Sequence, residues 1–117
     1  MSGRGSFDAL PVEEPYDGLR RRTFDSAGAT VNEYTFEPGA RFPLHRHPQE
    51  QITLVQDGEI ELTVAGETSI LAAGDWSVVD ADVEHGIRAR DGGARVVAII
   101  VPRRSSPTAY TVVEEPS

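Results

Sequence analysis

The sequence predicts an all-β protein, either a sandwich or a small barrel, from three observations. First, Gly58, Gly66 and Gly74 stand eight residues apart and mark turns between short segments. Second, those segments are rich in valine, isoleucine and threonine, the residues that favour strands. Third, the sequence shows no convincing helical period of about 3.6 residues over any long stretch. Turns this close together leave room for strands and none for helices.

The expected strands follow one another between these turns. Residues 59–64 show the pattern most clearly, because polar residues alternate with Ile60, Leu62 and Val64 along an extended chain. We expect strands over Leu19–Phe24, Val31–Phe36, Gln51–Gln56, Glu59–Val64, Thr68–Leu71, Trp76–Val79, His85–Arg90 and Arg95–Val101, and a short edge strand over Tyr110–Val113.

The length of 117 residues corresponds to a single domain. Residues 1–15 are rich in glycine, proline and acidic residues and are expected to form a flexible N-terminal segment. The folded domain is expected over residues 16–104. Residues 105–117 are interpreted as a C-terminal tail.

Charge and cysteine content exclude several classes of protein. The chain has 11 basic and 19 acidic residues, a net charge of −8, so binding to nucleic acid or to anionic membranes is not expected. It has no cysteine, which excludes disulfide scaffolds, zinc fingers, iron–sulfur sites and thiol catalysis. Residues 1–15 lack an apolar core like that of a signal peptide, and the longest aliphatic run, Val96–Val101, is too short to span a bilayer. We therefore expect a cytoplasmic protein.

The three histidines are the first candidates for chemistry. His45 and His47 stand two residues apart, so both imidazoles face the same side of an extended strand, and Gln51 shares their parity. His85 follows after further turns and can return on a facing strand. Three imidazoles and an amide oxygen could form a metal site with positions open for water or substrate. Taken alone, a His-x-His pair also occurs by chance or on surfaces.

The spacing around these residues is more specific. Gly39 is followed by five residues, His45-Arg46-His47, three residues, Gln51, six residues and Gly58. This order resembles the first motif of the cupin family, with glutamine in place of the usual glutamate. Gly74 and His85 resemble the second motif, in which Asp80, Asp82 and Ala89 replace the usual proline, glycine and asparagine. The resemblance covers roughly residues 31–102.

Membership of the cupin superfamily implies a double-stranded β-helix, or jelly roll, with a metal inside the barrel. The resemblance places the ligands at His45, His47, Gln51 and His85, holding one divalent transition metal per chain: Fe, Ni, Zn, Mn or Co. Glu50 is the nearest acid, but its parity turns it away from the ligand face. Four neutral ligands would leave the charge of the metal uncompensated and would favour anionic substrates.

Other residues have two interpretations each. A pocket wall or plain core is expected for Tyr34, Phe42, Val55, Trp76 and Ile87, of which Ile87 shares a strand face with His85. Arg41 and Arg88 could hold a substrate carboxylate or could be solvated. Arg20–Arg22 is expected to be solvated or to lie in an interface. Ile52 and Leu54 would face outward, and the run Val96–Val101 is apolar on both faces, so we expect a homodimer.

The resemblance does not choose one reaction, because the cupin fold supports many. The chain resembles the small cupins that linearise an unsaturated uronate, and also an isomerase of bacilysin biosynthesis and small polyketide cyclases. We expect a metal-binding cupin that acts on a small anionic or carbonyl-containing molecule, as an isomerase or lyase of sugar-acid or secondary metabolism. The alternatives are a non-enzymatic metal- or ligand-binding sensor, a metal-dependent dioxygenase and a polyketide cyclase. No catalytic residue is assigned.

One position separates this chain from the uronate-linearising group. Counting back from Pro102, Ala98 stands where that group has a carboxylate near the metal. A methyl group cannot transfer a proton, so we expect uronate linearisation to be weak or absent unless Glu33 or Tyr34 supplies the proton. An apolar pocket near Ala98 is also expected.

Overall fold

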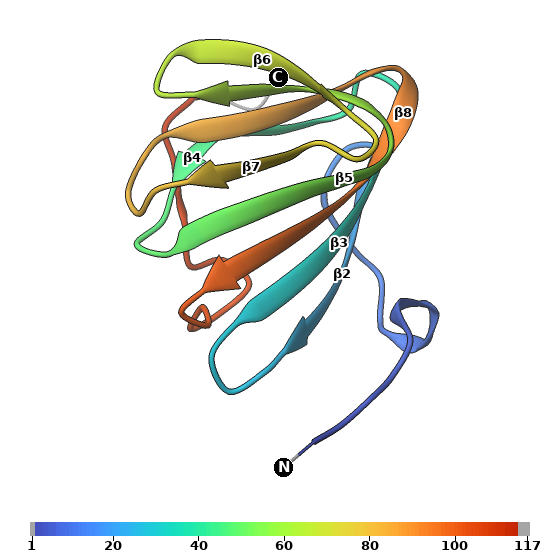
Figure 1. The fold of residues 1–117 in the computed structure, drawn as a ribbon, viewed down its shortest axis with the longest axis vertical. Helices are drawn as coiled ribbons and strands as arrows, with labels where there is room; N and C mark the ends of the chain where they lie inside the picture. Colours follow the sequence, from blue (N-terminus) through green and yellow to red (C-terminus); the bar gives the residue numbers. More distant parts are fainter. Residues whose placement is uncertain (1, 115–117) are drawn as a thin grey trace.

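Two long strands, β5 (Glu50–Val64) and β8 (His85–Val101), organise the computed structural model, which describes residues 2–114. They pair antiparallel along most of their length, from Glu50 opposite Val101 to Val64 opposite His85. The strands that flank one end of the β5–β8 pair form one half of the sheet with it. The strands that flank the other end of the pair form the other half. Figure 1 shows the result, a strongly curled and twisted sheet.

The shorter strands extend the two halves. On one side, β2 (Leu19–Asp25) pairs β3 (Thr30–Phe36), β3 pairs the C-terminal half of β8, and β7 (Trp76–Val79) pairs the N-terminal half of β5. On the other side, β4 (Arg41–Arg46) pairs the start of β8, and β6 (Glu67–Ala72) pairs the end of β5. Two short strands, β1 (Glu13–Tyr16) and β9 (Thr111–Val112), pair β2 and β4.

The crossing from one half to the other depends on glycine. The β5–β8 register shifts between Val55 and Asp57 and again between Gly58 and Ile60, which are bulges that bend both strands. Gly58 has φ +74°, and a Cβ atom there would lie 2.1 Å from the carbonyl oxygen of Gly93. Only glycine fits this close approach, so the bend is built into the sequence.

The interior lies between the two halves and follows strand alternation. β3 buries every second residue, and β5 alternates in the same way over its first half. Aliphatic and aromatic side chains fill one part of the interior, including Leu19, Phe36, Ile60, Leu62 and Val96. The prediction of an all-β chain that curls into a barrel is confirmed.

Several strand boundaries differ from those expected. Gln51–Gln56 and Glu59–Val64 are one strand, and so are His85–Arg90 and Arg95–Val101, because the glycines between them form bulges instead of hairpin turns. β1 and β4 were not expected. The expected edge strand near the C-terminus is present as β9.

The folded unit extends on both sides of the expected boundaries at residues 16 and 104. The 3-10 helix Phe7–Ala9 lies against β2, where the Phe7 and Phe24 rings are 5.7 Å apart, and β1 pairs β2. Near the other end, Tyr110 packs on the core and the Glu114 carboxylate accepts a 2.7 Å hydrogen bond from Leu44 N. Residues 1 and 115–117 of the two expected terminal segments lie outside the described part of the chain. None of the helical structure in residues 2–114 is long and apolar enough to cross a membrane.

Candidate metal centre

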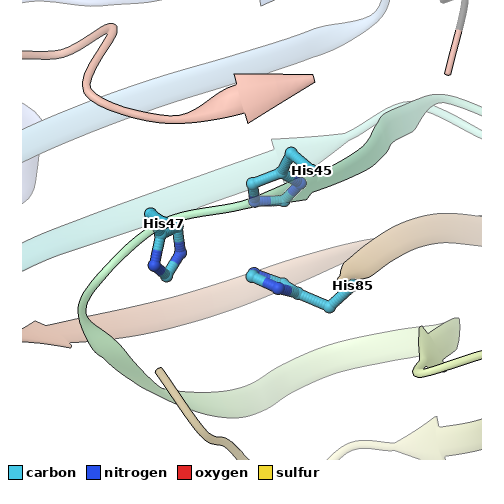
Figure 2. A group of neighbouring side chains, drawn as sticks. All are labelled: His45, His47 and His85. Carbon is cyan, nitrogen blue, oxygen red and sulfur yellow. The ribbon is translucent and has the colours of Figure 1, made fainter. Parts of the chain in front are cut away.

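Strand pairing brings the three histidines together although His85 is distant in sequence. His45 lies near the end of β4, directly opposite His85, the first residue of β8, and His47 follows the end of β4. All three are buried, and one ring nitrogen from each lies within 4.8 Å of the others. Figure 2 shows the rings converging on one point.

Backbone carbonyls fix which nitrogen of each ring carries the proton. The Nδ1 atoms of His45, His47 and His85 lie 2.8, 3.0 and 3.0 Å from the carbonyl oxygens of Pro43, Gln49 and Val83. A carbonyl oxygen only accepts, so each Nδ1–H donates. The three Nε2 atoms therefore present lone pairs.

Gln51 adds a fourth lone pair at the same point. Its Oε1 lies 3.1 Å from His47 Nε2 and 3.2 Å from His85 Nε2. Its Nε2 donates a 3.1 Å hydrogen bond to Thr53 Oγ1, which orients the amide oxygen toward the histidines. In the neutral tautomer that donates from Nδ1, Nε2 and Oε1 are both acceptors, and a bound cation would turn their mutual repulsion into attraction.

The protonation states suit a metal. Burial is the main cause that lowers the pKa of His45 to about 3 and that of His85 to about 4. Both rings are therefore neutral at pH 7, as metal ligands must be. Three imidazole nitrogens and one amide oxygen suit a divalent transition metal by their chemistry. The distances of 3.1 and 3.2 Å from Gln51 Oε1 to His47 and His85 match neighbouring ligands on bonds of about 2.1 Å.

The geometry brings together all four residues expected as ligands, but not for the expected reason. The chain turns after His47, so Gln51 lies on β5, paired with β7, whereas His45 lies on β4 beside the start of β8. Gln51 therefore approaches from a different part of the sheet and does not continue the face of His45 and His47. Glu50 is exposed and points away, as expected.

A small cavity of about 20 Å³ adjoins the histidines. Its wall includes Arg21, Tyr34, Phe42, Gln49, Arg104 and Tyr110. A larger surface groove of about 400 Å³ shares His47, Gln49, Ala109 and Tyr110 with the cavity. These shared residues separate the inner space from the surface.

Some expected pocket residues lie elsewhere. Tyr34 and Phe42 line the cavity, whereas Val55 and Ile87 belong to the core. Trp76 is 68% exposed, because its position on β7 faces outward. Arg41 and Arg88 line a different groove, where Arg41 pairs with Glu114.

Sequence reasoning missed four polar residues that line the cavity, namely Arg21, Gln49, Arg104 and Tyr110, and Arg21 is the most informative of them. It was expected to be solvated or in an interface, but only 4% of its surface is exposed and its guanidinium faces the cavity. The alternation along β2 could have indicated this position, because Arg21 stands two residues after Leu19 and so points to the same face of the strand. Leu19 is fully buried. A charged side chain in that position needs polar partners inside.

The expectation of an apolar wall near Ala98 is wrong. The register places Asn32 on one side of Ala98 and Thr53 on the other, and both polar side chains are fully buried. Asn32 Nδ2 donates to the Tyr34 hydroxyl at 3.4 Å and its Oδ1 accepts from Thr23 at 2.6 Å. Polar groups thus continue from Gln51 and Thr53 toward the cavity.

Three buried histidines that face one another inside a curled β-sheet could hold a metal ion, and comparison with known families gives the class of protein. Residues 32–102 match the Cupin domain family, and the chain belongs to that family.

Two kinds of relative are similar to the chain. It is 29% identical over 100 residues to the pectin degradation protein KdgF of Dickeya dadantii, covering 84% of this chain and 91% of that protein. It is 33% identical over 79 residues to quercetin 2,3-dioxygenase of Bacillus subtilis, covering 67% of this chain but spanning only 23% of that enzyme.

Solved structures agree with the fold. A RmlC-like cupin from Shewanella frigidimarina superposes with a TM-score of 0.80 at 27% identity, covering 89% of this chain and 95% of that one. KdgF from Halomonas sp. superposes with a TM-score of 0.78 at 26% identity, covering 87% and 97%.

Metal content tests the donor set. We expect close to one divalent transition metal per wild-type chain and a loss of most of it in His47→Ala, which removes one converging lone pair. Glu50→Gln is the matched control and should keep its metal, because Glu50 is exposed. Elemental analysis of the purified proteins measures both, and full retention by His47→Ala would contradict the assignment.

Stability against pH tests the buried histidines in EDTA-treated protein. The folded pKa values of His45 and His85 lie below the unfolded value of about 6.5, so protons favour the unfolded chain as the pH falls. Stability should be complete well above pH 6.5 and should fall below it, down to about pH 4 for the contribution of His85 and about pH 3 for that of His45.

By pH 5 the expected loss is about 2 kcal/mol per histidine. Urea unfolding at pH 7 and pH 5 measures it. His45→Gln removes one of the two titrations and should show about half of the fall. An unfolding free energy that is equal at both pH values would disprove the assignment of neutral buried rings.

Proposed function

We propose that this cupin binds one divalent transition metal through His45, His47, Gln51 and His85 and acts on a small anionic or carbonyl-containing molecule. The observation that carries the proposal is the convergence of four neutral acceptor atoms beside a cavity. The reaction class that fits best is an isomerase or lyase of sugar-acid or secondary metabolism. The similarity to KdgF supports that class.

The donor set determines what kind of substrate is favoured. A bound divalent metal supplies Lewis acidity, which polarises a carbonyl or carboxylate oxygen. Because all four donors are neutral, the protein leaves the positive charge of the site uncompensated. Fe, Ni, Zn, Mn and Co all accept such donors.

Proton transfer in the cavity would depend on tyrosine. The residues that line the cavity include Tyr34 and Tyr110 but neither aspartate nor glutamate. Burial raises the pKa of Tyr34, so its hydroxyl stays protonated at neutral pH and can donate to a developing negative charge. Glu33 cannot serve, because it lines a groove on the other face of β3 with Arg20, Arg22 and Arg95.

Uronate linearisation is the reaction to test first. We expect conversion of unsaturated uronate to be 10²- to 10⁴-fold slower than in a dedicated enzyme, roughly the effect of losing a positioned acid–base group, since Ala98 offers none. The fall in ultraviolet absorbance of the substrate measures it, with EDTA-treated protein as the blank. Turnover equal to that of a dedicated enzyme would contradict the role given to Ala98. A loss of that turnover in Tyr34→Phe would then identify the proton carrier.

Two alternatives remain supported by particular observations. The absence of a carboxylate among the residues that line the cavity favours a non-enzymatic metal- or ligand-binding sensor. The similarity to quercetin 2,3-dioxygenase favours a metal-dependent dioxygenase. Oxygen uptake by the metal-loaded protein would support a dioxygenase. Ligand binding without turnover would support a sensor.

We also propose that the protein is a homodimer through the outer face of β5, β7 and β8. The register aligns Ile99, Ile52 and Val78 across these strands, and Val97, Leu54 and Trp76 in the next row. Trp76 and Val78 are 68% and 47% exposed. A second copy presenting the same rows would cover them, since two-fold contacts pair like surfaces.

The mass in solution tests the dimer. Light scattering should report about twice the chain mass of 12.7 kDa at micromolar concentration. Ile52→Glu should shift the protein toward monomer, because it places a charge in the apolar contact. Glu67→Gln, an exposed position on β6, is the control and should remain dimeric. A wild-type monomer at micromolar concentration would rule out this interface.

A further inference from the structure

Two buried polar atoms without partners lie in the same cavity. Among residues 2–114, the fully buried side-chain nitrogen and oxygen atoms that lack a hydrogen bond are Arg21 Nη1 and Gln49 Oε1. Both residues line the cavity beside His45 and His47. An unsatisfied buried donor on a charged group is costly, and such atoms in native proteins point to a ligand or an ordered water.

Positive charge also exceeds negative charge at this place. Arg21 Nε donates to Glu13 Oε1 at 3.2 Å, and the Glu13 side chain is 43% exposed. Arg104 lines the same cavity and forms no salt bridge within the described part of the chain. Burial, and then the like charge of Arg21, lower the pKa of Arg104. Two guanidinium groups therefore line the cavity, whereas Glu13, the carboxylate that pairs with Arg21, is partly solvated and is not among the lining residues.

From these observations we infer that the cavity binds the carboxylate group of a small 2-hydroxycarboxylate. The carboxylate accepts from Arg21 Nη1 and faces Arg104, and the adjacent hydroxyl donates to Gln49 Oε1. A guanidinium is the side chain best matched to a carboxylate, because its planar fork presents parallel N–H donors. This inference deepens the proposed function, since it states which part of the substrate the protein itself recognises.

The size of the cavity limits the ligand. About 20 Å³ accepts one or two water-sized groups, so the carboxylate oxygens alone would fill the cavity and a phosphate with four oxygens would not fit. The hydroxyl would lie at the opening, because Gln49 lines both the cavity and the surface groove. The remainder of the ligand would extend along His47 and Tyr110, which belong to both the cavity and the surface groove. The carbon next to the carboxylate would then lie on the side of the histidines, where proton transfer would occur.

Calorimetric titration with glycolate tests the site in EDTA-treated and in metal-loaded protein. We expect glycolate to bind the EDTA-treated protein, and uncharged glycolamide to bind at least tenfold more weakly. Arg21→Gln and Arg104→Gln should each raise the Kd for glycolate at least tenfold. Arg20→Gln is the matched control, since Arg20 is the neighbouring residue on the exposed side of β2, and should change the Kd less than twofold.

The hydroxyl contact has its own test. Glycolate should bind more tightly than acetate, and Gln49→Leu should remove that difference while leaving acetate binding unchanged. The substitution keeps the backbone carbonyl that orients His47, so metal content should not change. Equal affinity for glycolate and acetate in the wild type would overturn the hydroxyl part of the inference.

The outcomes separate this site from the metal site. The thermal midpoint and the metal content show whether each variant folds. If Arg21→Gln does not fold, the glycolate affinity of Arg104→Gln alone tests the carboxylate site. The inference is overturned if the folded arginine variants bind glycolate with the Kd of the wild type. It is also overturned if glycolate binds only to metal-loaded protein and its Kd does not change in either arginine variant. Glycolate binding lost in the arginine variants, in a protein that takes up no metal, would support the site and disprove the proposed function.

Discussion

Four lone pairs that point at one another inside a barrel are the constraint on which the rest of this structure depends. His45, His47 and His85 each commit Nδ1–H to a backbone carbonyl, and Gln51 commits its amide nitrogen to Thr53. At the centre, Gln51 Oε1 lies 3.1 and 3.2 Å from the Nε2 atoms of His47 and His85, and one ring nitrogen from each of the three histidines lies within 4.8 Å of the others. Such an arrangement is unfavourable without a cation, so the surrounding structure has to hold it in place.

The sheet supplies that rigidity. β5 and β8 belong to both halves of the barrel, and the close approach of Gly58 and Gly93 lets them bend there. Because of this bend, Gln51 at one end of β5 lies against His85 at the start of β8 and His45 on β4. Three of the four side chains come from strands, β4, β5 and β8, and His47 directly follows β4. Backbone hydrogen bonds set the spacing of these strands, so the paired sheet would resist a small shift of any one of them.

The polar part of the interior is larger than the metal site. Asn32, Thr53 and Tyr34 connect the surroundings of Gln51 with the cavity that holds Arg21 and Arg104. The protein has a net charge of −8, yet Arg21 and Arg104 line the cavity beside His45 and His47. Burial strengthens the field of such charges, which is the physical basis of the carboxylate site that we propose.

The sequence alone determined the strand class of the chain and its candidate metal ligands, because both depend on the spacing of residues along the chain. The glycine spacing predicted an all-β chain, and the spacing around His45, His47, Gln51 and His85 identified the cupin family and the residues that converge. Only the tertiary structure decided that Gln51 comes from another part of the sheet, that Arg21 lies inside, that Trp76 lies outside, and that Ala98 sits between Asn32 and Thr53. The reason is physical: alternation divides a strand into two faces, but which face becomes the interior depends on how distant strands pair and curl.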